Sequence, residues 1–598
     1  MSGIRRRGAG NLDCFITKEV KLNMENINSW KDIHWITIET KVFRLQLRIY
    51  KAAVNKEYEK MYKLQKLLIK SQFAKFLAVK RVTQENAGKK TPGVDKKLIK
   101  SPREKFQLAQ RLQLDGKSSP ILRTYIPKPD GSQRPLGIPT IEDRSKQMLA
   151  YLALSPQWEA CFEARSYGFR PGRSVNDAIE AIFLGISKKP KWVLDADIAK
   201  CFDKINHKYL LTKCNTFPEM HKQLKAWLKT GILDGKTYVF PEMGTPQGGI
   251  ISPLLANIAL HGLREHLDTY INSLGGNRRA NRQSTTYVRY ADDFVIMHPD
   301  LATLKGLQQT VEDFLKPMGL ELHPQKTRIR HTLNPENNEK PGFSFLGFDI
   351  IQRIRWNRMR AATTNRVTEQ TFITLITPSK EGIKRHKKKL RDFIRSYRGA
   401  SQDRLIQKLN PIIRGYALSK RTQISSRTFQ DLDKYTFEHL WKWAKRRHPK
   451  MSRFKLKEKY WHTIGKRNWV FGIKDKDNDE LSLQLQYHSK IPIKRYAMVK
   501  GTSSPFDGNL IYWATRTGKN PLIPPIKANL IKEQKGICGL CGKYFLPKDI
   551  IERDHIVPKA LGGLNRRDNV HAVHSYCHSV KTKSDRLKIN RTKRRSTT

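Results

Sequence analysis

Tyr287-Val288-Arg289-Tyr290-Ala291-Asp292-Asp293-Phe294-Val295-Ile296 places two adjacent carboxylates between two runs of β-forming residues. Neighbouring residues on a straight strand point to opposite faces of a sheet, so only a turn brings both carboxylates near one cation. The pattern therefore predicts a β-hairpin with Asp292 and Asp293 at its tip. An isolated Asp-Asp pair is usually a solvated turn, so a functional interpretation depends on the rest of the chain.

A second strand-like run, Trp192-Val193-Leu194-Asp195-Ala196-Asp197, also ends in acidic residues. Two divalent ions about 3.5–4 Å apart need several shared carboxylates, and together they stabilise the attacking and leaving oxygens of phosphoryl transfer. The two acidic segments together therefore indicate a metal-dependent site for phosphoryl transfer.

The composition indicates nucleic acid as the partner. The chain has 598 residues, with 114 Lys and Arg against 54 Asp and Glu, and a formal net charge of +60. Self-repulsion on this scale destabilises a compact chain unless a polyanion screens it. Hydrophobic residues make up 38% of the chain, which excludes a disordered basic tail and allows three or four cores. No stretch approaches the roughly 20 apolar residues that span a bilayer, so we expect no membrane partner.

The N-terminus is rich in arginine and lacks the apolar segment of a secretory signal. We therefore expect a protein that is not secreted and that acts in the cytoplasm of a bacterium or in an organelle, a plastid or mitochondrion. The seven cysteines are too few and too unevenly spaced for a disulfide scaffold.

Hydrophobic periodicity changes along the chain. Apolar residues at helical spacing predict basic helices over 30–82, and short strands alternate with helices up to about residue 354. An all-helical pattern covers 382–448. Short β-prone runs broken by glycine and proline follow over 466–525, and the prolines of 521–525 predict a linker to a C-terminal module.

That C-terminal module contains two close pairs of metal-ligating residues. Cys538-Gly539-Leu540-Cys541 is one pair, and His574-Ser575-Tyr576-Cys577 repeats the spacing with one histidine. A single CxxC pair could be redox-active, whereas two such pairs favour a structural tetrahedral Zn²⁺ site. We therefore predict that Cys538, Cys541, His574 and Cys577 bind zinc.

Six motifs occur in the order found in reverse transcriptases, at 126–139, 167–174, 244–253, 290–293, 319–327 and 345–348. Together with the basic N-terminal extension, they resemble the proteins encoded inside group II introns, which are reverse transcriptases that also act as maturases. The resemblance covers about residues 30–590. It implies a right-hand polymerase that copies RNA into DNA.

The resemblance also implies roles for individual residues. Asp197, Asp292 and Asp293 match the catalytic triad that binds Mg²⁺, whereas Asp195 and Asp203 match no metal ligand and are expected to be structural. Phe202 matches the aromatic residue that stacks under the incoming sugar and excludes a 2′-hydroxyl. Contacts with the incoming deoxynucleoside triphosphate are implied for Lys128, Arg134, Gln247 and Lys326.

The helical region after the polymerase motifs resembles the thumb, or maturase domain, of the same family. The segment 409–416 carries the resemblance, and the basic run 384–391 precedes it. Such a run is a solvated helix face in many proteins, but here we expect a surface that follows phosphates. RNA contacts are implied for Lys387, Lys388, Arg414 and Tyr416. The bases and aromatic residues of 441–447 could stack on unpaired bases, with at least one tryptophan in the core.

The last two regions resemble a DNA-binding region and an HNH endonuclease with a ββα-metal fold. For 466–525 a small packed β element is the alternative. The endonuclease resemblance rests on His555, Asn569 and His578, and His574 departs from the usual second CxxC pair. It implies that His555 is the general base, that Asp554 and His578 hold Mg²⁺ or Mn²⁺, and that Asn569 fixes the backbone of His555. We expect His571 to lie at the surface or to support the metal ligands without binding the metal itself.

The sequence thus predicts a multidomain α+β fold: a right-hand polymerase of fingers and palm, an α-helical thumb, a small DNA-binding region and a C-terminal ββα-metal nuclease. The expected domains are an unstructured leader (1–24), a basic helical N-terminal extension (25–100), fingers and palm (101–379), thumb (380–465), DNA-binding region (466–525) and zinc-containing endonuclease (526–598).

The implied functions are RNA-directed DNA synthesis, help in intron splicing, and nicking of target DNA for target-primed reverse transcription. The expected partners are group II intron RNA in a ribonucleoprotein, double-stranded target DNA and deoxynucleoside triphosphates. Two alternatives are a reverse transcriptase of another prokaryotic system and a maturase that binds RNA without catalysis. The thumb motif and the nuclease disfavour the first, and the intact acidic triad disfavours the second.

Overall fold

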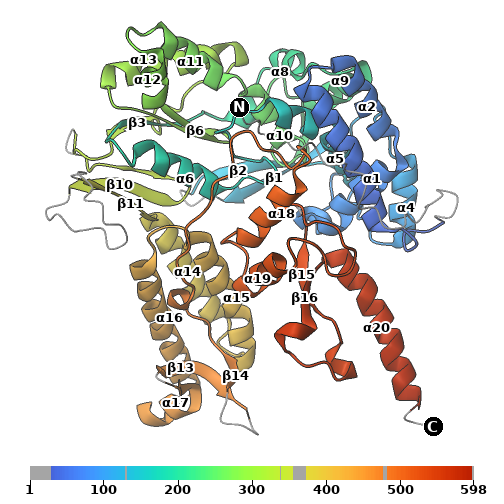
Figure 1. Ribbon diagram of the computed structural model, residues 1–598, viewed down its shortest axis with the longest axis vertical. Helices are drawn as coiled ribbons and strands as arrows, with labels where there is room; N and C mark the ends of the chain where they lie inside the picture. Colours follow the sequence, from blue (N-terminus) through green and yellow to red (C-terminus); the bar gives the residue numbers. More distant parts are fainter. Residues whose placement is uncertain are drawn as a thin grey trace, which may run out of the picture.

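The computed structural model describes residues 28–595 except 128–130, 337–338, 355–371, 466, 476–480 and 548. The predicted leader and Lys128 lie outside the described residues. The polymerase half forms the upper part of the molecule, and two extensions descend from it (Figure 1). One extension holds the predicted thumb and the other the C-terminal module.

The N-terminal region is helical, as the periodicity of 30–82 predicts. On the first helix the buried side chains of Ile38, Val42, Gln46 and Ile49 recur at intervals of three or four residues, and the helix packs on the long helix α5. The helices are α1 (Trp35–Val54), α2 (Tyr58–Lys70), α3 (Gln72–Lys80), α4 (Pro102–Arg111) and α5 (Ile141–Cys161).

A four-stranded sheet in the order β2-β1-β4-β5 forms the predicted fingers, and a second sheet in the order β6-β7-β3-β8 forms the palm. The palm strands β6 and β7 are buried along nearly their whole length because helix α6 contacts the sheet through β6 and helix α13 contacts it through β7 (Figure 1). The strands are β1 (Ile121–Pro127), β2 (Gln133–Ile138), β3 (Trp192–Asp197), β4 (Ile232–Asp234), β5 (Thr237–Val239), β6 (Thr286–Tyr290), β7 (Asp293–His298) and β8 (Arg328–His331).

Palm helices surround these strands. Helix α6 begins at Val175 with a capping box made by Ser174 and Asp177, and α10 begins with a proline in its first turn. The helices are α6 (Val175–Ile186), α7 (Cys201–Lys204), α8 (His207–Cys214), α9 (Pro218–Leu228), α10 (Ser252–Ala259), α11 (Leu263–Ser273), α12 (Arg278–Ser284) and α13 (Leu301–Leu315).

A small sheet in the order β11-β10-β9 leads from the palm to three thumb helices. The buried side chains of Leu390, Leu409 and Leu440 join these helices in one core. Helices α14 and α16 both run away from the palm (Figure 1). The elements are β9 (Phe343–Phe345), β10 (Phe348–Ile354), β11 (Phe372–Pro378), α14 (Lys380–Ser396), α15 (Gln402–Lys420), α16 (Ser426–Arg447) and α17 (Arg453–Tyr460).

The region predicted as short β runs is only partly β. Strands β12 (Trp461–Ile464), β13 (Arg467–Lys474) and β14 (Leu481–Gln484) form a sheet at the far end of the thumb. The prediction is wrong for 510–519, which form helix α18 (Leu510–Lys519). Its N-cap, Asn509, accepts a hydrogen bond from the backbone of Tyr512, and its Trp513 packs in the palm core.

Residues 496–516 are fastened to the palm through the buried carboxylate of Asp177. This carboxylate accepts hydrogen bonds from Tyr496 Oη at 2.9 Å, from the Val499 backbone at 2.8 Å and from Arg516 Nη2 at 2.8 Å. A Cβ added at Gly172 would lie 2.6 Å from the Trp513 ring, so only glycine allows this contact. The segment is therefore built into the polymerase core.

The C-terminal module contains α19 (Pro525–Glu533), an antiparallel pair of strands, β15 (Ile551–His555) and β16 (Val570–His574), and helix α20 (Ser575–Arg595). This order gives the predicted ββα arrangement. The module contacts helix α1 and the residues just before it: Lys543 Nζ donates to Thr40 Oγ1 at 2.6 Å, and Tyr576 Oη donates to the Ile33 carbonyl at 3.3 Å.

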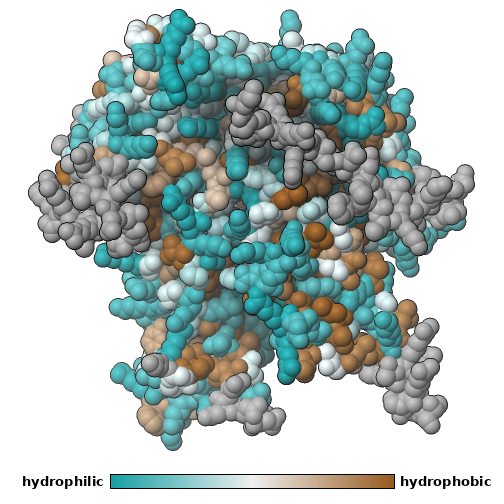
Figure 2. Space-filling view, viewed as in Figure 1, coloured by the Kyte–Doolittle hydropathy of each residue, from teal (hydrophilic) through white to brown (hydrophobic). Residues whose placement is uncertain are grey.

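No helix in the described part of the chain is long and apolar enough to cross a membrane. Hydrophilic residues dominate much of the face shown in Figure 2, especially over the polymerase half. Apolar side chains gather mainly in the lower half, around the two extensions.

Replacing Asp177 by alanine should lower the free energy of unfolding by about 3–5 kcal/mol, because the variant leaves the Arg516 guanidinium without its carboxylate. Chemical denaturation measures the loss, and limited proteolysis should find new cleavage within 496–519. Asp177→Asn keeps the shape of the side chain and should lose less. An unchanged midpoint and cleavage pattern in Asp177→Ala would contradict this account of the docking.

Candidate polymerase and nuclease sites

A tight turn brings Asp292 and Asp293 together, as the sequence predicts. Tyr290 pairs with Asp293 across the β6–β7 hairpin, and Ala291 adopts a left-handed conformation with φ of 61°. This conformation is uncommon for a residue with a Cβ and needs support from its surroundings. Gly168 supplies part of that support: a Cβ there would lie 2.3 Å from the Ala291 nitrogen.

The third carboxylate comes from the neighbouring strand. Asp197 is the last residue of β3 and pairs directly with Asp293 of β7. The register of three strands therefore places the ends of both acidic segments side by side. The structure brings together the three residues that the resemblance implies for the polymerase triad.

The three carboxylates repel one another. Partial burial and the neighbouring charges of Asp292 and Asp197 raise the pKa of Asp293 to about 7, although its side chain still reaches solvent. Burial and Asp197 likewise raise the pKa of Asp292. Crowded carboxylates that keep access to solvent are ligands suited to Mg²⁺, so the residues present fit the expected ion.

A lysine already lies against this cluster. Lys326 Nζ donates to Asp197 Oδ2 at 2.6 Å, and this hydrogen bond raises the pKa of the lysine. Arg134, at the start of the fingers strand β2, is exposed, and its charge acts on Asp292. Of the predicted triphosphate contacts, Lys326 and Arg134 are thus close enough to influence the carboxylates.

The predicted residues around the sugar lie next to the triad. Phe202 packs partly on the core and meets the half-exposed Phe169 edge to face, with ring centroids 6.4 Å apart. Gln247 Nε2 lies 3.3 Å from the carboxylate of Asp203. Burial raises the pKa of that carboxyl. Asp203 therefore positions Gln247, which agrees with the structural role expected for it.

Sequence reasoning missed a buried ionic network beneath the turn. The Arg289 side chain is fully buried, and its guanidinium donates to Asn257 Oδ1 at 3.1 Å, to the Ala291 carbonyl at 3.3 Å and to Glu163 Oε2 at 3.4 Å. Asn257 in turn donates to the Gly168 carbonyl at 2.8 Å. The signal in the sequence was an arginine inside the otherwise uncharged strand Tyr287–Tyr290.

Burial opposes the charge of Glu163, but a hydrogen bond to His261 and the charge of Arg289 outweigh it, so the pKa of Glu163 lies well below its usual range. The network thus holds a fixed positive charge against the backbone of the turn. It restrains the left-handed Ala291 at its carbonyl, while Gly168 lies against its backbone nitrogen.

The thumb residues singled out from the sequence occupy different settings. Lys387 lies over the Tyr435 ring at 5.3 Å, Lys388 is exposed, and Arg414 donates to Gln486 at 2.9 Å. Tyr416 instead stacks on the buried His386 ring with centroids 3.8 Å apart, and its hydroxyl is buried. The geometry favours packing, rather than RNA contact, for Tyr416.

The two tryptophans of 441–447 are both packed. Trp443 is buried in the thumb core, and its indole nitrogen donates to the Tyr397 carbonyl at 2.9 Å. Trp441 joins an aromatic cluster with Trp461 and Trp469. The expectation that at least one of them lies in the core is confirmed.

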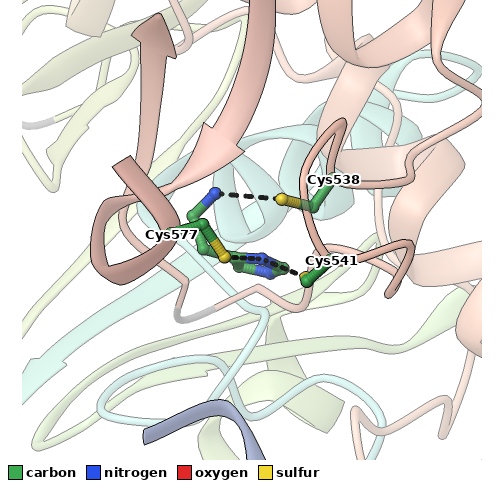
Figure 3. Close-up of side chains that lie close together, drawn as sticks. Cys538, Cys541 and Cys577 are labelled. Atoms are coloured by element: carbon green, nitrogen blue, oxygen red, sulfur yellow. Dashed lines mark hydrogen bonds between the residues drawn. The ribbon is translucent and has the colours of Figure 1, made fainter. Parts of the chain in front are cut away.

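The four predicted zinc ligands converge. The ligand atoms of Cys538, Cys541, His574 and Cys577 all lie within 4.8 Å of one another. Figure 3 shows Cys538 and Cys541, which share one loop, facing Cys577 from another segment of the module. His574 Nδ1 lies 3.4 Å from Cys541 Sγ, while its Nε2 lies 3.2 Å from Asp549 Oδ2. A carboxylate on the second ring nitrogen is typical of histidines that bind metal, so the set fits Zn²⁺.

The predicted endonuclease residues gather where β15, β16 and α20 meet. Asp554 pairs with His571 across the strands, and the carboxylate lies 3.0 Å from His571 Nε2 and 3.4 Å from His578 Nε2. The Asn569 side chain accepts from the Val557 backbone and donates to the Val557 carbonyl, which fixes the chain just after His555. His571, expected as a supporting residue, contacts Asp554 directly.

Two further residues of this group were not predicted. Lys581 Nζ donates to the His555 carbonyl at 2.7 Å and lies 3.2 Å from Asp554 Oδ2. Glu552 lies 2.5 Å from His578 Nδ1. Both positions depend on helix α20 crossing the hairpin, which no local pattern reveals. His555 Nε2 itself lies 3.2 Å from Asn565 Oδ1 at the half-exposed strand end.

Four family models match the chain. Residues 126–350 match the reverse transcriptase (RNA-dependent DNA polymerase) model, and 30–112 match the N-terminal domain of reverse transcriptase. Residues 383–461 match the group II intron maturase-specific domain, and 538–584 match the HNH endonuclease. The predicted combination of polymerase, maturase domain and endonuclease is confirmed.

Individual relatives agree with these matches. Protein YkfC of Escherichia coli (strain K12) is 33% identical over 322 residues, which cover 48% of this chain and 82% of that protein. Group II intron-encoded protein LtrA of Lactococcus lactis subsp. cremoris is 30% identical over 327 residues, which cover 44% of this chain and 52% of that protein. An uncharacterized 91 kDa protein in a cob intron of Schizosaccharomyces pombe is 29% identical over 266 residues, which cover 36% of this chain and 32% of that protein. The alignment with LtrA thus spans about half of its length.

The two predicted metal sites of the C-terminal module should be separable. Cys541→Ser removes a zinc thiolate from a small core that depends on it, so we expect loss of zinc and new proteolytic cleavage beyond about residue 526. His555→Ala should keep the zinc and the fold but lose DNA cleavage. Zinc stoichiometry, limited proteolysis and a strand-specific nicking assay measure the three effects. Full zinc content in Cys541→Ser, or normal nicking by His555→Ala, would refute the assignment.

Proposed function

Because this chain belongs to the family of group II intron-encoded reverse transcriptases, we propose that it copies intron RNA into DNA with Asp197, Asp292 and Asp293 as Mg²⁺ ligands. The observation that carries the proposal is the register that sets Asp197 opposite Asp293 at the tip of a restrained hairpin. The chain is an RNA-directed DNA polymerase and a DNA endonuclease by its domains.

The residues around the triad would orient an incoming deoxynucleotide. Bound divalent ions would lower the pKa of the primer 3′-hydroxyl and neutralise charge as the α-phosphorus is attacked and pyrophosphate leaves. Lys326 and Arg134 would add fixed positive charge on the triphosphate, and Lys128 is proposed for the same role. Phe202 would press against the sugar where a 2′-hydroxyl would project, with Gln247 held beside it by Asp203.

The endonuclease would nick one strand of the target DNA. His555 would accept a proton from the attacking water. Lys581 holds the carbonyl of His555, and Asn569 holds the backbone of Val557 just after it. Asp554 and His578 would hold Mg²⁺ or Mn²⁺, which would polarise the scissile phosphate. The Zn²⁺ site would stabilise the module without taking part in cleavage.

These activities form a sequence of events. The thumb would bind group II intron RNA as a ribonucleoprotein that assists splicing, the endonuclease would open a 3′-hydroxyl in double-stranded target DNA, and the polymerase would extend it with deoxynucleoside triphosphates. Residues 466–525 are proposed to contact the DNA. We place these reactions inside a bacterial cell or an organelle.

Asp292→Asn should abolish primer extension on an RNA template, because it removes a metal ligand. RNA affinity should stay nearly unchanged, because many cations contribute to it. The variant should also stabilise the metal-free protein by about 1 kcal/mol, since the raised pKa values of Asp292 and Asp293 show that the ionised cluster is unfavourable above neutral pH. Primer extension and thermal unfolding in EDTA at pH 8 measure the two effects. Normal extension would refute the triad.

Phe202→Ala should admit ribonucleotides far more readily, because removal of the ring leaves room for a 2′-hydroxyl. The measurement is the ratio of kcat/KM for a deoxynucleotide and the matching ribonucleotide. Phe169→Ala removes the neighbouring ring and is a suitable control, because it should change the ratio much less. If Phe202→Ala keeps the wild-type preference, this phenylalanine has another role.

A further inference from the structure

Three exposed apolar side chains surround His555, the general base proposed for the endonuclease. Ile556 and Val557 directly follow it, and their side chains are 48% and 46% exposed. Leu564, which is 56% exposed, precedes Asn565, whose Oδ1 lies 3.2 Å from His555 Nε2. The three side chains, called here the apolar lip, therefore border the place where a DNA endonuclease must meet its substrate.

The loop that carries the apolar lip is held in one shape by its backbone. Asn569 Nδ2 donates to the Val557 carbonyl at 3.0 Å and to the Leu564 carbonyl at 2.9 Å. The two ends of the loop thus meet at one side-chain amide. The lip is held in place before any ligand arrives, so little conformational entropy remains to be lost on binding.

The apolar lip contributes nothing to the core of its own module. Among the described residues, that core is formed by other side chains, such as Phe545 and Val573. Single exposed apolar residues are common on protein surfaces and need no explanation. Three of them on a fixed loop around one catalytic histidine form a surface that a ligand would cover.

Cationic side chains lie beside the apolar lip. Lys559 and Arg566 are exposed and, within the part of the chain that the structure describes, form no ion pair. Asp568 is the only carboxylate in residues 556–569. A second copy of this chain, with its own formal charge of +60, would be repelled here. Apolar side chains bordered by cations suit DNA, which presents an apolar base stack between two rows of phosphates.

We propose that the apolar lip enters the base stack of the target DNA beside the scissile phosphate and partly unstacks one base step. Apolar side chains that enter from the minor groove open such a step and kink the duplex. The kink would turn the scissile phosphate toward His555, and burial of the lip would offset the cost of unstacking.

This inference rests on the proposed endonuclease function and deepens it. A nuclease that must open a base step favours sequences whose steps deform easily, even where it contacts no base edge. Unstacking would also help the reaction that follows, because the new 3′-hydroxyl must leave the endonuclease and reach the polymerase as a primer. A terminal base pair that is already partly unstacked separates more easily.

The test uses the full-length chain. The strongest nick that the wild-type chain makes in a supercoiled plasmid with Mn²⁺ is mapped by sequencing, and a duplex of about 40 base pairs is built around it. A second duplex carries a two-base mismatch at the nicked step, which removes the stacking that the lip must break. Ile556→Ser/Leu564→Ser should nick the matched duplex about tenfold more slowly than the wild type, and the mismatched duplex less than twofold more slowly.

A matched control separates the lip from general surface effects. Ile526→Ser/Leu587→Ser removes two apolar side chains that are 61% and 64% exposed on α19 and α20, outside the lip. This variant should nick both duplexes at nearly the wild-type rate. Zinc content and thermal unfolding should be unchanged in both double variants, because all four side chains are exposed.

A second measurement follows the DNA itself. The base 2-aminopurine, placed beside the nicked step, fluoresces more strongly when it is unstacked. With Ca²⁺ in place of Mn²⁺ to keep the duplex uncut, binding of the wild-type chain should raise the fluorescence severalfold, and binding of Ile556→Ser/Leu564→Ser should not. Equal slowing of this variant on both duplexes, or an equal rise in fluorescence, would overturn the proposal.

Failure of the proposed function would look different. If the wild-type chain makes no nick in the plasmid with either Mn²⁺ or Mg²⁺, the endonuclease assignment fails and the role of the lip fails with it. If the wild-type chain nicks and Ile556→Ser/Leu564→Ser nicks the matched duplex equally fast, only the role of the lip is refuted, and its apolar surface would then belong to a protein partner.

Discussion

The mutual repulsion of three carboxylates is the constraint on which the polymerase half depends. Asp197, Asp292 and Asp293 can share a small volume only if the protein holds them there against their own charge. The β3–β7 register, the left-handed Ala291, the missing Cβ of Gly168 and the buried Arg289 all serve that purpose. The palm thus holds three carboxylates close together, and bound metal would reduce their mutual repulsion.

Repulsion between like charges also affects the surface, where the charges are positive. A formal charge of +60 leaves many cations without carboxylate partners, and nucleic acid is the ligand that would neutralise them. Metal and nucleic acid that bind the folded chain would therefore stabilise it.

Some features of the site could be predicted from the sequence because they are local. The tip of the hairpin is set by β-formers on both sides of Asp292, and the zinc ligands by the spacing around Cys541. The supports were missed because their partners are distant in sequence: Arg289 meets Glu163, and Lys581 meets the backbone of His555. Helix α18 was missed because β-prone residues outweighed the N-cap signal of Asn509, although packing of Trp513 decides the outcome.

The cap of helix α6 has a consequence for how the chain reaches its native state. Asp177 is synthesised early, whereas its partner Val499 lies 322 residues further along, so this face of the palm stays uncovered until the residues after the thumb have been synthesised. During that interval the carboxylate at the start of α6 lacks three of its donors. A chain that ends after the thumb would contain every polymerase motif and still leave this face of the palm exposed. The region after the thumb is therefore a late-synthesised part of the palm's own packing.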